Sequence, residues 1–484
     1  MNRMKEKLRL VKTKHPSFNM GSILTGILLV SLFMSLFVSP VYDMHAFAKT
    51  GTEEIDTDDG FSGAAGGDGS QASPYLISTT EQFTAFRDYI NGTGDYDGSA
   101  HTGMGEFFKL TADIDLGGSE GNQWMPIGAD LDPEDDFGFD GTAFSGTFDG
   151  DGHMITGLYI NATEESFKGL FGLVKGGTVK NLGVDGTVTG YRYVGSVIGF
   201  DTSSIVTNCY STGFVTGEVD VGGVVGYNNN TGTVTDCYNT GFVTGIIDVG
   251  GVVGDNYDST AAGCHNDGFV TGRDNVGGIV GCNNYKSVVT SSYNTGEVTG
   301  SRYVGGVVGD NDYTVSVFTP SKVRNCYNTG KVMGTSDVGG VVGFNISSKV
   351  ENCHNIGEVM GSDYDVGGVV GRNYINSTAA NCYNTGSVTG RENVGGVVGG
   401  NGNKSEVANC YNIGEVTGDS DIGGVAGGNY HDSTAANCYY LAGTADYGIG
   451  SVSGDEGAEK FDGKSNVLFA WLLSLSVLEL NNML

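Results

Sequence analysis

The chain has 484 residues and a formal net charge of −31, with 56 acidic residues against 25 basic ones. This balance excludes nucleic acid and anionic membrane surfaces as natural partners, because both are bound through basic faces. Glycine is enriched at 83 residues without a Gly-X-Y period, which excludes collagen, and a hydrophobic share of 39% excludes a disordered chain.

The N-terminus has the pattern of an export signal. Basic residues between Arg3 and Lys14 precede an apolar stretch at residues 20–38, and Ala46-Phe47-Ala48 offers a cleavage site. We predict a signal peptide over residues 1–48, cleaved after Ala48, and a secreted or cell-surface protein. The apolar stretch is nearly long enough to cross a bilayer, so an uncleaved anchor is the alternative. We expect no membrane span in the mature chain, because no second stretch qualifies.

Two segments follow before the repeats begin. Residues 49–75 are acidic and rich in Gly and Ser, which indicates a linker. Residues 76–166 are expected to form a cap that covers the open edge of the first repeat. Within this cap, the capping-box pattern at residues 78–81 precedes Phe83, Phe86 and Ile90, which predicts one short helix ending near Asn91-Gly92.

Residues 167–440 repeat one block. Its clearest copy runs from Val221 to Asn228 as Val-Gly-Gly-Val-Val-Gly-Tyr-Asn, and the copies recur mostly every 27 or 28 residues. The leading residues are Val194, Val221, Val249, Val276, Val304, Val338, Val366, Val394 and Ile422, with a degenerate copy at Phe167. A fixed period of this length is typical of a solenoid.

Each period offers three short strand signals separated by Gly or Asn turns, which suits one coil of a three-sided solenoid. We therefore predict an all-β, right-handed parallel β-helix of about ten coils of ~28 residues, with the short helix in its N-terminal cap. Residues 441–484 are expected to be a C-terminal cap or a truncated end.

One asparagine recurs at the end of each block and predicts a structural ladder, because amide side chains can bond one another from coil to coil. The ladder residues are Asn228, Asn256, Asn283, Asn311, Asn345, Asn373, Asn401 and Asn429, and the earlier copy has Asp201. Recurrent glycines from Gly213 to Gly414 and valines from Val215 to Val416 predict a closely packed turn and a stacked aliphatic core.

The block followed by Asn-Cys-Tyr-Asn-Thr-Gly-x-Val-x-Gly resembles the GLUG motif, whose Gly-Leu-x-Gly core is matched by residues 169–172. The entry segments at residues 110–116, 124–128 and 148–153 are similar to those that precede such repeats in exported bacterial proteins. The resemblance covers residues 75–465. It implies a surface role without a particular reaction, since these repeats occur in adhesin-like proteins and in the non-catalytic part of immunoglobulin-A1-specific metallopeptidases.

One aromatic column is the candidate ligand face. Its tyrosines are Tyr210, Tyr238, Tyr293, Tyr327, Tyr383, Tyr411 and Tyr439, with His265 and His354 in the gaps. Such a strip is expected to keep its polar tips in water, where it can stack on sugar rings or anchor a protein. The alternative is a column that only stacks between coils.

Aspartates align directly before the leading Val, at Asp220, Asp248, Asp337 and Asp365. We expect turn-forming residues on a solvated corner, and the alternative is weak Ca²⁺ sites, because neighbouring carboxylates suit that ion. No other cofactor is indicated. Eight cysteines share one repeat position and are expected to be reduced and inward-facing, whereas Cys282 lies off this column and is expected to be exposed and reactive.

No catalytic residues are predicted. The seven histidines include no His-Glu-x-x-His pair, which zinc proteolysis needs. We expect a non-catalytic scaffold, adhesin-like or ligand-binding, whose partner is a glycan or a protein at the cell surface. The alternative is a polysaccharide-degrading β-helix enzyme, or the remnant of a larger surface peptidase that lacks its catalytic domain.

Overall fold

The computed structural model describes residues 61–93, 100–129, 141–312 and 319–453. All of these lie in one compact unit, within Gly60–Leu484. The predicted signal peptide, its cleavage site and residues 454–484 of the predicted C-terminal segment lie outside the described residues. Within the described parts of the chain, no helix has the length and apolarity that crossing a membrane requires.

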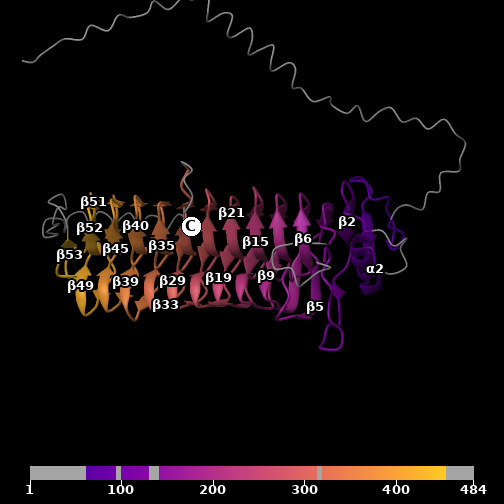
Figure 1. The fold of residues 1–484 in the computed structure, drawn as a ribbon, viewed down its shortest axis with the longest axis horizontal. Helices are drawn as coiled ribbons and strands as arrows, with labels where there is room; N and C mark the ends of the chain where they lie inside the picture. Colours follow the sequence, from indigo (N-terminus) through magenta and orange to yellow (C-terminus); the bar gives the residue numbers. More distant parts are fainter. Residues whose placement is uncertain (1–60, 94–99, 130–140, 313–318, 454–484) are drawn as a thin grey trace, which may run out of the picture. The chain divides into compact units, whose positions relative to one another are not determined.

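The described unit is a parallel β-solenoid of about ten turns, as predicted (Figure 1). One coil contains β15 (Val225–Asn229), β16 (Thr233–Thr235), β17 (Tyr238–Asn239), β18 (Phe242–Thr244) and β19 (Ile247–Gly250). Each strand pairs in parallel with its equivalent in the next coil, as Val243 does with Val270. We number the resulting sheets 1 (the β16 type), 2 (β17 and β18), 3 (β19) and 4 (β15).

Stacking of equivalent strands gives each sheet its members. Sheet 1 contains β1 (Tyr75–Ile77), β2 (Phe107–Leu110), β4 (Thr147–Asp149), β7 (Thr178–Lys180), β11 (Ile205–Thr207), β16, β21 (Thr260–Ala262), β26 (Val288–Thr290), β31 (Lys322–Arg324), β36 (Lys349–Glu351), β41 (Thr378–Ala380), β46 (Glu406–Ala408) and β51 (Thr434–Ala436). Sheet 2 contains β3 (Ile114–Asp115), β5 (Met154–Asn161), β8 (Gly183–Thr189), β12 (Tyr210–Ser211), β13 (Phe214–Thr216), β17, β18, β22 (His265–Asn266), β23 (Phe269–Thr271), β27 (Tyr293–Asn294), β28 (Val298–Thr299), β32 (Tyr327–Asn328), β33 (Val332–Gly334), β37 (His354–Asn355), β38 (Val359–Gly361), β42 (Tyr383–Asn384), β43 (Val388–Thr389), β47 (Tyr411–Asn412), β48 (Val416–Thr417) and β52 (Tyr439–Tyr440).

The other two sheets enclose the candidate site. Sheet 3 contains β9 (Arg192–Gly195), β14 (Val219–Gly222), β19, β24 (Asp274–Gly277), β29 (Arg302–Gly305), β34 (Ser336–Gly339), β39 (Tyr364–Gly367), β44 (Glu392–Gly395) and β49 (Ser420–Gly423). Sheet 4 contains β6 (Phe171–Lys175), β10 (Ile198–Thr202), β15, β20 (Val253–Tyr257), β25 (Val280–Asn284), β30 (Val308–Asp312), β35 (Val342–Ile346), β40 (Val370–Tyr374), β45 (Val398–Gly402), β50 (Ala426–Tyr430) and β53 (Ile449–Ser453).

The core is a stack of valine columns. Val221, Val224, Val225, Val234 and Val243 of one coil are all fully buried, and their equivalents in neighbouring coils lie above and below them. β-Branched side chains pack well on pleated strands, so one hydrophobic pattern repeated per coil builds a continuous interior. The predicted aliphatic column from Val215 to Val416 is confirmed as part of this core.

The cap is continuous with the solenoid, because β1, β2 and β4 are the first strands of sheet 1. Helix α2 (Thr80–Asn91) buries Phe83, Phe86 and Ile90, as predicted. Its N-cap is Thr79, whose hydroxyl accepts from the Gln82 backbone, so the capping box begins one residue later than expected.

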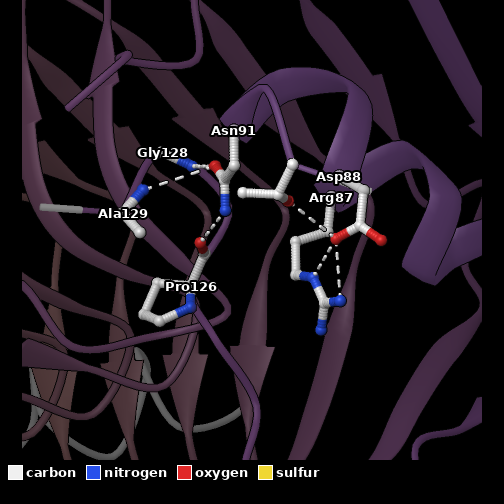
Figure 2. Close-up of polar contacts among 7 residues, drawn as sticks. Arg87, Asp88, Asn91, Pro126, Gly128 and Ala129 are labelled. Carbon is white, nitrogen blue, oxygen red and sulfur yellow. Dashed lines mark hydrogen bonds and ion pairs between the residues drawn. The ribbon is translucent and has the colours of Figure 1, made fainter. Parts of the chain in front are cut away.

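The N-terminal boundary of the cap also differs from the expectation. Phe61 is buried, and its ring lies 6.1 Å from that of Phe108. Residues 61–75 therefore belong to the cap and not to a linker. Asn91 ties the helix to the following loop, since its Nδ2 donates to Pro126 O over 2.9 Å and its Oδ1 accepts from Gly128 N over 2.8 Å (Figure 2).

Candidate functional site

Two columns of side chains meet along the corner between sheets 3 and 4, which we call the trough. A contact of 5.2 Å between the ring centroids of Tyr193 and Tyr227 joins the two columns. The sheet 3 column comprises Tyr193, Asp220, Asp248, Asn275, Tyr303, Asp337, Asp365, Asn393 and Asp421. The sheet 4 column comprises Leu173, Phe200, Tyr227, Asp255, Cys282, Asp310, Phe344, Arg372, Gly400 and Gly428.

The trough is narrow because the two sheets touch through their backbones. A Cβ atom on Gly226 would lie 2.6 Å from the carbonyl carbon of Tyr193, closer than real side chains approach, so glycine is required here. The residues of the sheet 3 column adopt left-handed backbone, with φ of 55° at Asp220, a conformation that Asp and Asn tolerate better than most residues. These aspartates lie within strands of sheet 3, Asp220 in β14 and Asp337 in β34, so the left-handed backbone expected of turn residues occurs inside a strand, and their turn-forming role stays a prediction.

The predicted solvated corner is wrong. Asp220 is 1% exposed and Asp337 is 2% exposed, because both lie in the trough between sheets 3 and 4. A buried carboxylate needs a hydrogen-bond donor, a cation or a proton, whereas a carboxylate on a solvated turn is stabilised by water.

The trough brings Asp220 and Asp248 together with Asp255, which the sequence analysis did not single out. One carboxylate oxygen from each of the three lies within 4.8 Å of the others. Arg192 Nε donates to Asp220 Oδ2 over 2.7 Å, and Asn275 Nδ2 donates to Asp248 Oδ1 over 2.7 Å. Clustered oxygen ligands of this kind are what Ca²⁺ prefers, so the calcium prediction stays open at Asp220 and Asp248.

Burial decides the protonation of this trio. It raises the pKa of Asp248 to about 7, with repulsion from Asp220 as the next cause. Burial also raises the pKa of Asp255 well above its ordinary value, with Asp220 and Asp248 adding repulsion, and it raises the pKa of Asp220 although Arg192 opposes the shift. Burial therefore favours the protonated form of these carboxyls unless a cation binds among them.

The other calcium candidates, Asp337 and Asp365, are balanced by a protein cation. Arg372 places Nη1 3.9 Å from Asp337 Oδ1 and Nε 3.6 Å from Asp365 Oδ2. Burial raises the pKa of Asp337 to about 7 and that of Asp365 to about 6. The Arg372 guanidinium therefore offsets the negative charges of Asp337 and Asp365, which a metal ion would otherwise have to offset.

The predicted tyrosine column is a continuous ladder on the outer face of sheet 2. From Tyr210 to Tyr411, including His265 and His354, neighbouring ring centroids lie 4.6–5.1 Å apart with interplanar angles of 4–11°. Tyr439 continues the register in β52. Because each ring face is covered by its neighbours, the ladder offers ring edges and hydroxyl groups, and not open faces, to a ligand.

A second aromatic column lies beside this ladder and was missed by the sequence analysis. Phe214, Phe242 and Phe269 are 54%, 45% and 51% exposed, and their rings stack at 5.1 and 5.2 Å. Strands β13, β18 and β23 follow the tyrosine-bearing strands directly, so both columns share one face of sheet 2. The signal was the change from Gly-Phe-Val-Thr-Gly in these coils to Gly-Glu-Val-Thr-Gly at Glu297.

The predicted asparagine ladder is confirmed and lies inside the solenoid. Asn228 Nδ2 donates to Asn256 Oδ1 over 2.8 Å, and the same bond recurs through all eight residues to Asn429. All eight side chains are buried.

A second buried ladder was not predicted. It runs from Asn239 to Asn412 through equivalent side-chain bonds of 2.8–2.9 Å. Its signal was present in the sequence, as the asparagine two residues after the aligned cysteines from Cys237 to Cys410 and after Ser292 in the same column.

The aligned cysteines face the interior as free, buried thiols, as expected. Cys282 is also buried, so the expectation that it is exposed is wrong. It occupies the sheet 4 column of the trough between Asp255 and Asp310, where burial and these carboxylates raise the pKa of its thiol. A thiol with a raised pKa is a poor nucleophile.

Comparison with known proteins supports the repeat. Residues 217–244, 300–333, 362–389 and 390–417 match the model of the GLUG motif. The chain is 33% identical over 162 residues to halomucin of Haloquadratum walsbyi, which covers 33% of this chain and 2% of that protein. It is 34% identical over 126 residues to a "Putative Gly-rich membrane protein" of Evansella cellulosilytica, covering 25% of this chain and 12% of that protein.

The chain thus spans a small part of the curated relatives it matches. Among solved structures, a "putative immunoglobulin A1 protease" from Bacteroides ovatus aligns over 84% of this chain and 91% of its own, with 18% identity and a TM-score of 0.26. This chain therefore carries GLUG-motif repeats and has a β-solenoid fold.

Proposed function

We propose that this chain is an exported, non-catalytic surface scaffold that binds a protein through the outer face of sheet 2. The observation that carries the proposal is the pair of aromatic columns in three successive coils, which we call the aromatic face. It consists of Tyr210, Tyr238, His265, Phe214, Phe242 and Phe269.

The exposure of the three phenylalanines supports binding. Large apolar side chains that gather on one face of an otherwise acidic protein are typical of interaction surfaces. Stacking holds the rings in place before a partner arrives, so little side-chain entropy is lost on association. Because the ring faces are covered, a protein surface suits this face better than a sugar ring that must lie flat on an aromatic face.

The proposed location rests on the expected signal peptide and on the relatives. One relative carries the name of a membrane protein and another that of a halomucin. The net charge of −31 supports solubility outside the cell.

Coils further along the solenoid show which substitutions the fold accepts, and these guide the test. In the column of Phe214, Phe242 and Phe269, coils further along carry Glu297 and Ser387, so the fold accepts small or polar residues there. We would replace all three phenylalanines with serine and measure binding to an array of purified extracellular proteins. The matched control is Glu415→Gln in the same column.

We expect the triple variant to lose about tenfold or more in affinity for the proteins that the unchanged chain binds, while the control binds normally. The proposal fails if the array shows no binding, or if the triple variant binds as the unchanged chain does.

A polysaccharide-degrading enzyme is the second candidate, and one observation favours it. Arg192 opposes the rise in the pKa of Asp220, whereas repulsion from Asp220 adds to the rise in the pKa of Asp248 to about 7, and carboxyl pairs whose surroundings differ in this way serve glycoside hydrolysis. The near-complete burial of Asp220 argues against substrate contact. Release of reducing ends from a polysaccharide that Asp248→Asn abolishes would favour this enzyme over the scaffold. A remnant of a larger peptidase would show neither activity.

A further inference from the structure

A groove of about 1220 Å³ crosses the outer face of sheet 4 where the cap meets the first coils. Its floor is made by β6, β10 and β15, whose register aligns two rows of side chains. One row is Leu173, Phe200 and Tyr227, and the other is Lys175, Thr202 and Asn229.

The aromatic side of this groove differs from the stacked face of sheet 2. Tyr193 stands at an interplanar angle of 89° to Phe200, with 4.9 Å between the centroids, while Phe200 and Tyr227 stack at 29° and 5.0 Å, so this cluster is less parallel than the ladders of sheet 2. Tyr193 also has a φ of 57°, in a column where most residues are Asp or Asn. A bulky residue held in left-handed backbone is strained, and such strain gathers at ligand sites.

The described residues that line the groove carry one positive charge. Among the described residues that line it, Lys175 is the only charged one, although the chain carries 56 acidic residues. The remaining polar groups are hydroxyls and amides, including those of Thr202 and Asn229. Such a surface fits a ligand that offers hydroxyl groups and apolar ring faces, and Lys175 adds a partner for a carboxylate.

We infer that this groove binds an acidic oligosaccharide, with sugar rings against Phe200 and Tyr227 and a uronate carboxylate against Lys175. The inference rests on the proposed role as a ligand-binding scaffold and places a second ligand class on a different sheet.

The test is affinity electrophoresis of the purified full chain through gels that contain polygalacturonate or an uncharged xylan. Lys175→Gln removes the cation. Tyr227→Leu removes an aromatic ring, and the fold accepts leucine in this column, because Leu173 occupies the equivalent position two coils earlier. The matched control is Lys322→Gln on sheet 1. We expect polygalacturonate to bind more tightly than xylan, with Lys175→Gln removing about tenfold of the affinity for polygalacturonate alone and Tyr227→Leu weakening both.

Two results overturn the inference: no retardation by either polysaccharide, or an equal effect of Lys322→Gln and Lys175→Gln. The triple serine variant of the aromatic face separates this inference from the proposed function. It should lose protein binding and keep polysaccharide binding, whereas Tyr227→Leu should do the reverse.

A separate observation concerns the first rung of the buried asparagine ladder. Asp201 is the register partner of Asn228, and both are fully buried. Both carboxylate oxygens of Asp201 and the Oδ1 of Asn228 have no hydrogen-bond partner among the described residues. A Cβ placed on Gly232 would contact Asn228 Oδ1 and lie 2.8 Å from Asp201 Oδ2, so the two acceptors face one small space.

Rotating the asparagine side-chain amides by 180° would turn Asn228 Nδ2 toward Asp201, but the rest of the ladder does not permit this rotation. Every ladder asparagine except Asn311 also directs Nδ2 toward a backbone carbonyl of its own coil, as Asn256 does to Ser259 O over 3.3 Å and Asn429 to Ser433 O over 2.9 Å. Flipped side chains would place Oδ1 against these carbonyl oxygens, and two acceptors cannot bond each other.

We propose that Asp201 is a neutral carboxylic acid whose proton is donated to Asn228 Oδ1, and that it caps the ladder. The groups packed around it are Val174, Asn228, Ser204 and Gly232, none of which carries a charge. Burial supports this state, since it raises the pKa of Asp201 to about 7 although the nearby hydroxyl and backbone N–H of Ser204 oppose the shift. The same carboxyl in the unfolded chain ionises near its ordinary pKa, so rising pH favours unfolding until Asp201 ionises in the folded chain as well.

The test compares the unchanged chain with Asp201→Asn, which supplies an amide donor as the other rungs do. Chemical unfolding is followed at pH 5 and pH 8, and the difference between the two proteins isolates Asp201 from other carboxyls. We expect the unfolding constant of the unchanged chain to rise about tenfold or more relative to that of Asp201→Asn between these values. An equal pH dependence of both proteins, or an Asp201→Asn variant that does not fold, overturns the proposal.

Discussion

Asn239 Nδ2 donates a hydrogen bond of 2.8 Å to Asn266 Oδ1, and both side chains are fully buried. Asn239 also closes its own turn, since its Oδ1 accepts from Gly241 N over 3.1 Å and its Nδ2 donates to Gly241 O over 3.3 Å. Each rung is therefore satisfied only when the neighbouring coil is in register, which couples the coils.

Loss of one rung of this ladder should be costly. Asn294→Ala leaves Asn266 Nδ2 and Asn328 Oδ1 without their side-chain partners. We expect a loss of about 3 kcal/mol in the free energy of unfolding, since a buried unsatisfied group costs ~1–3 kcal/mol. The control is Asn381→Gly, at an exposed position where Asn381 Nδ2 donates to Asn352 Oδ1; glycine keeps the left-handed backbone there, and the change should cost less than about 1 kcal/mol. Urea unfolding measures both, and equal losses would contradict a special role of the buried ladder.

Glycine at the trough should be irreplaceable. Gly226→Ala places a methyl group against the backbone of Tyr193 and Val194, so sheets 3 and 4 must separate. We expect a loss of about 2 kcal/mol or more in the free energy of unfolding. Gly121→Ala is the control, because a Cβ atom there meets open space. Thermal unfolding that shows no difference between these variants would refute the close contact of the two sheets.

The Asp220, Asp248 and Asp255 trio should make the fold sensitive to pH. The pKa of Asp248 is raised in the folded state, so the stability that it contributes is present at low pH and lost as pH rises from its ordinary range to about 7. We expect the melting temperature to fall less in Asp248→Asn than in the unchanged chain between about pH 5 and pH 8. Glu415→Gln is the control for a change of charge elsewhere, and identical pH profiles of all three proteins would contradict the prediction.

The same experiment tests the calcium prediction. Millimolar Ca²⁺ at the higher pH should restore the melting temperature of the unchanged chain, because the cation replaces the lost protons. It should have no such effect on Asp248→Asn. A Ca²⁺ response of equal size in both proteins would place the ion elsewhere.

Modification by a thiol reagent should show whether the cysteines are buried in the folded coils. All nine cysteines are buried and free, so a thiol reagent should modify none of them in the native chain and all nine after unfolding. Cys282 is the sharpest case, because the sequence analysis placed it on the surface and the structure places it in the trough. Rapid modification of one thiol in the native chain, mapped to Cys282 by mass spectrometry, would contradict the buried position.

Register could be predicted because it is local and periodic. Asn228 and Asn256 occupy equivalent positions of consecutive blocks, and stacking of equivalent positions follows from the repeat itself. The tyrosine ladder that begins at Tyr210 could be predicted for the same reason. Asp255 could not be placed beside Asp220 in this way, because the two belong to different positions of the block and meet only where sheet 3 folds against sheet 4.

The periodicity of the sequence by itself determined the solenoid, the number of its coils and the columns that stack along it, because hydrogen bonding between parallel strands aligns like with like. Only the tertiary structure decided which polar columns are buried and which columns meet one another. The contact between sheets 3 and 4 buries Asp220 and raises its pKa, and the path of the chain through β17 and β18 places Asn239 inside and leaves Phe242 exposed. These outcomes depend on how one coil bends, which a pattern of residue types along the chain does not specify.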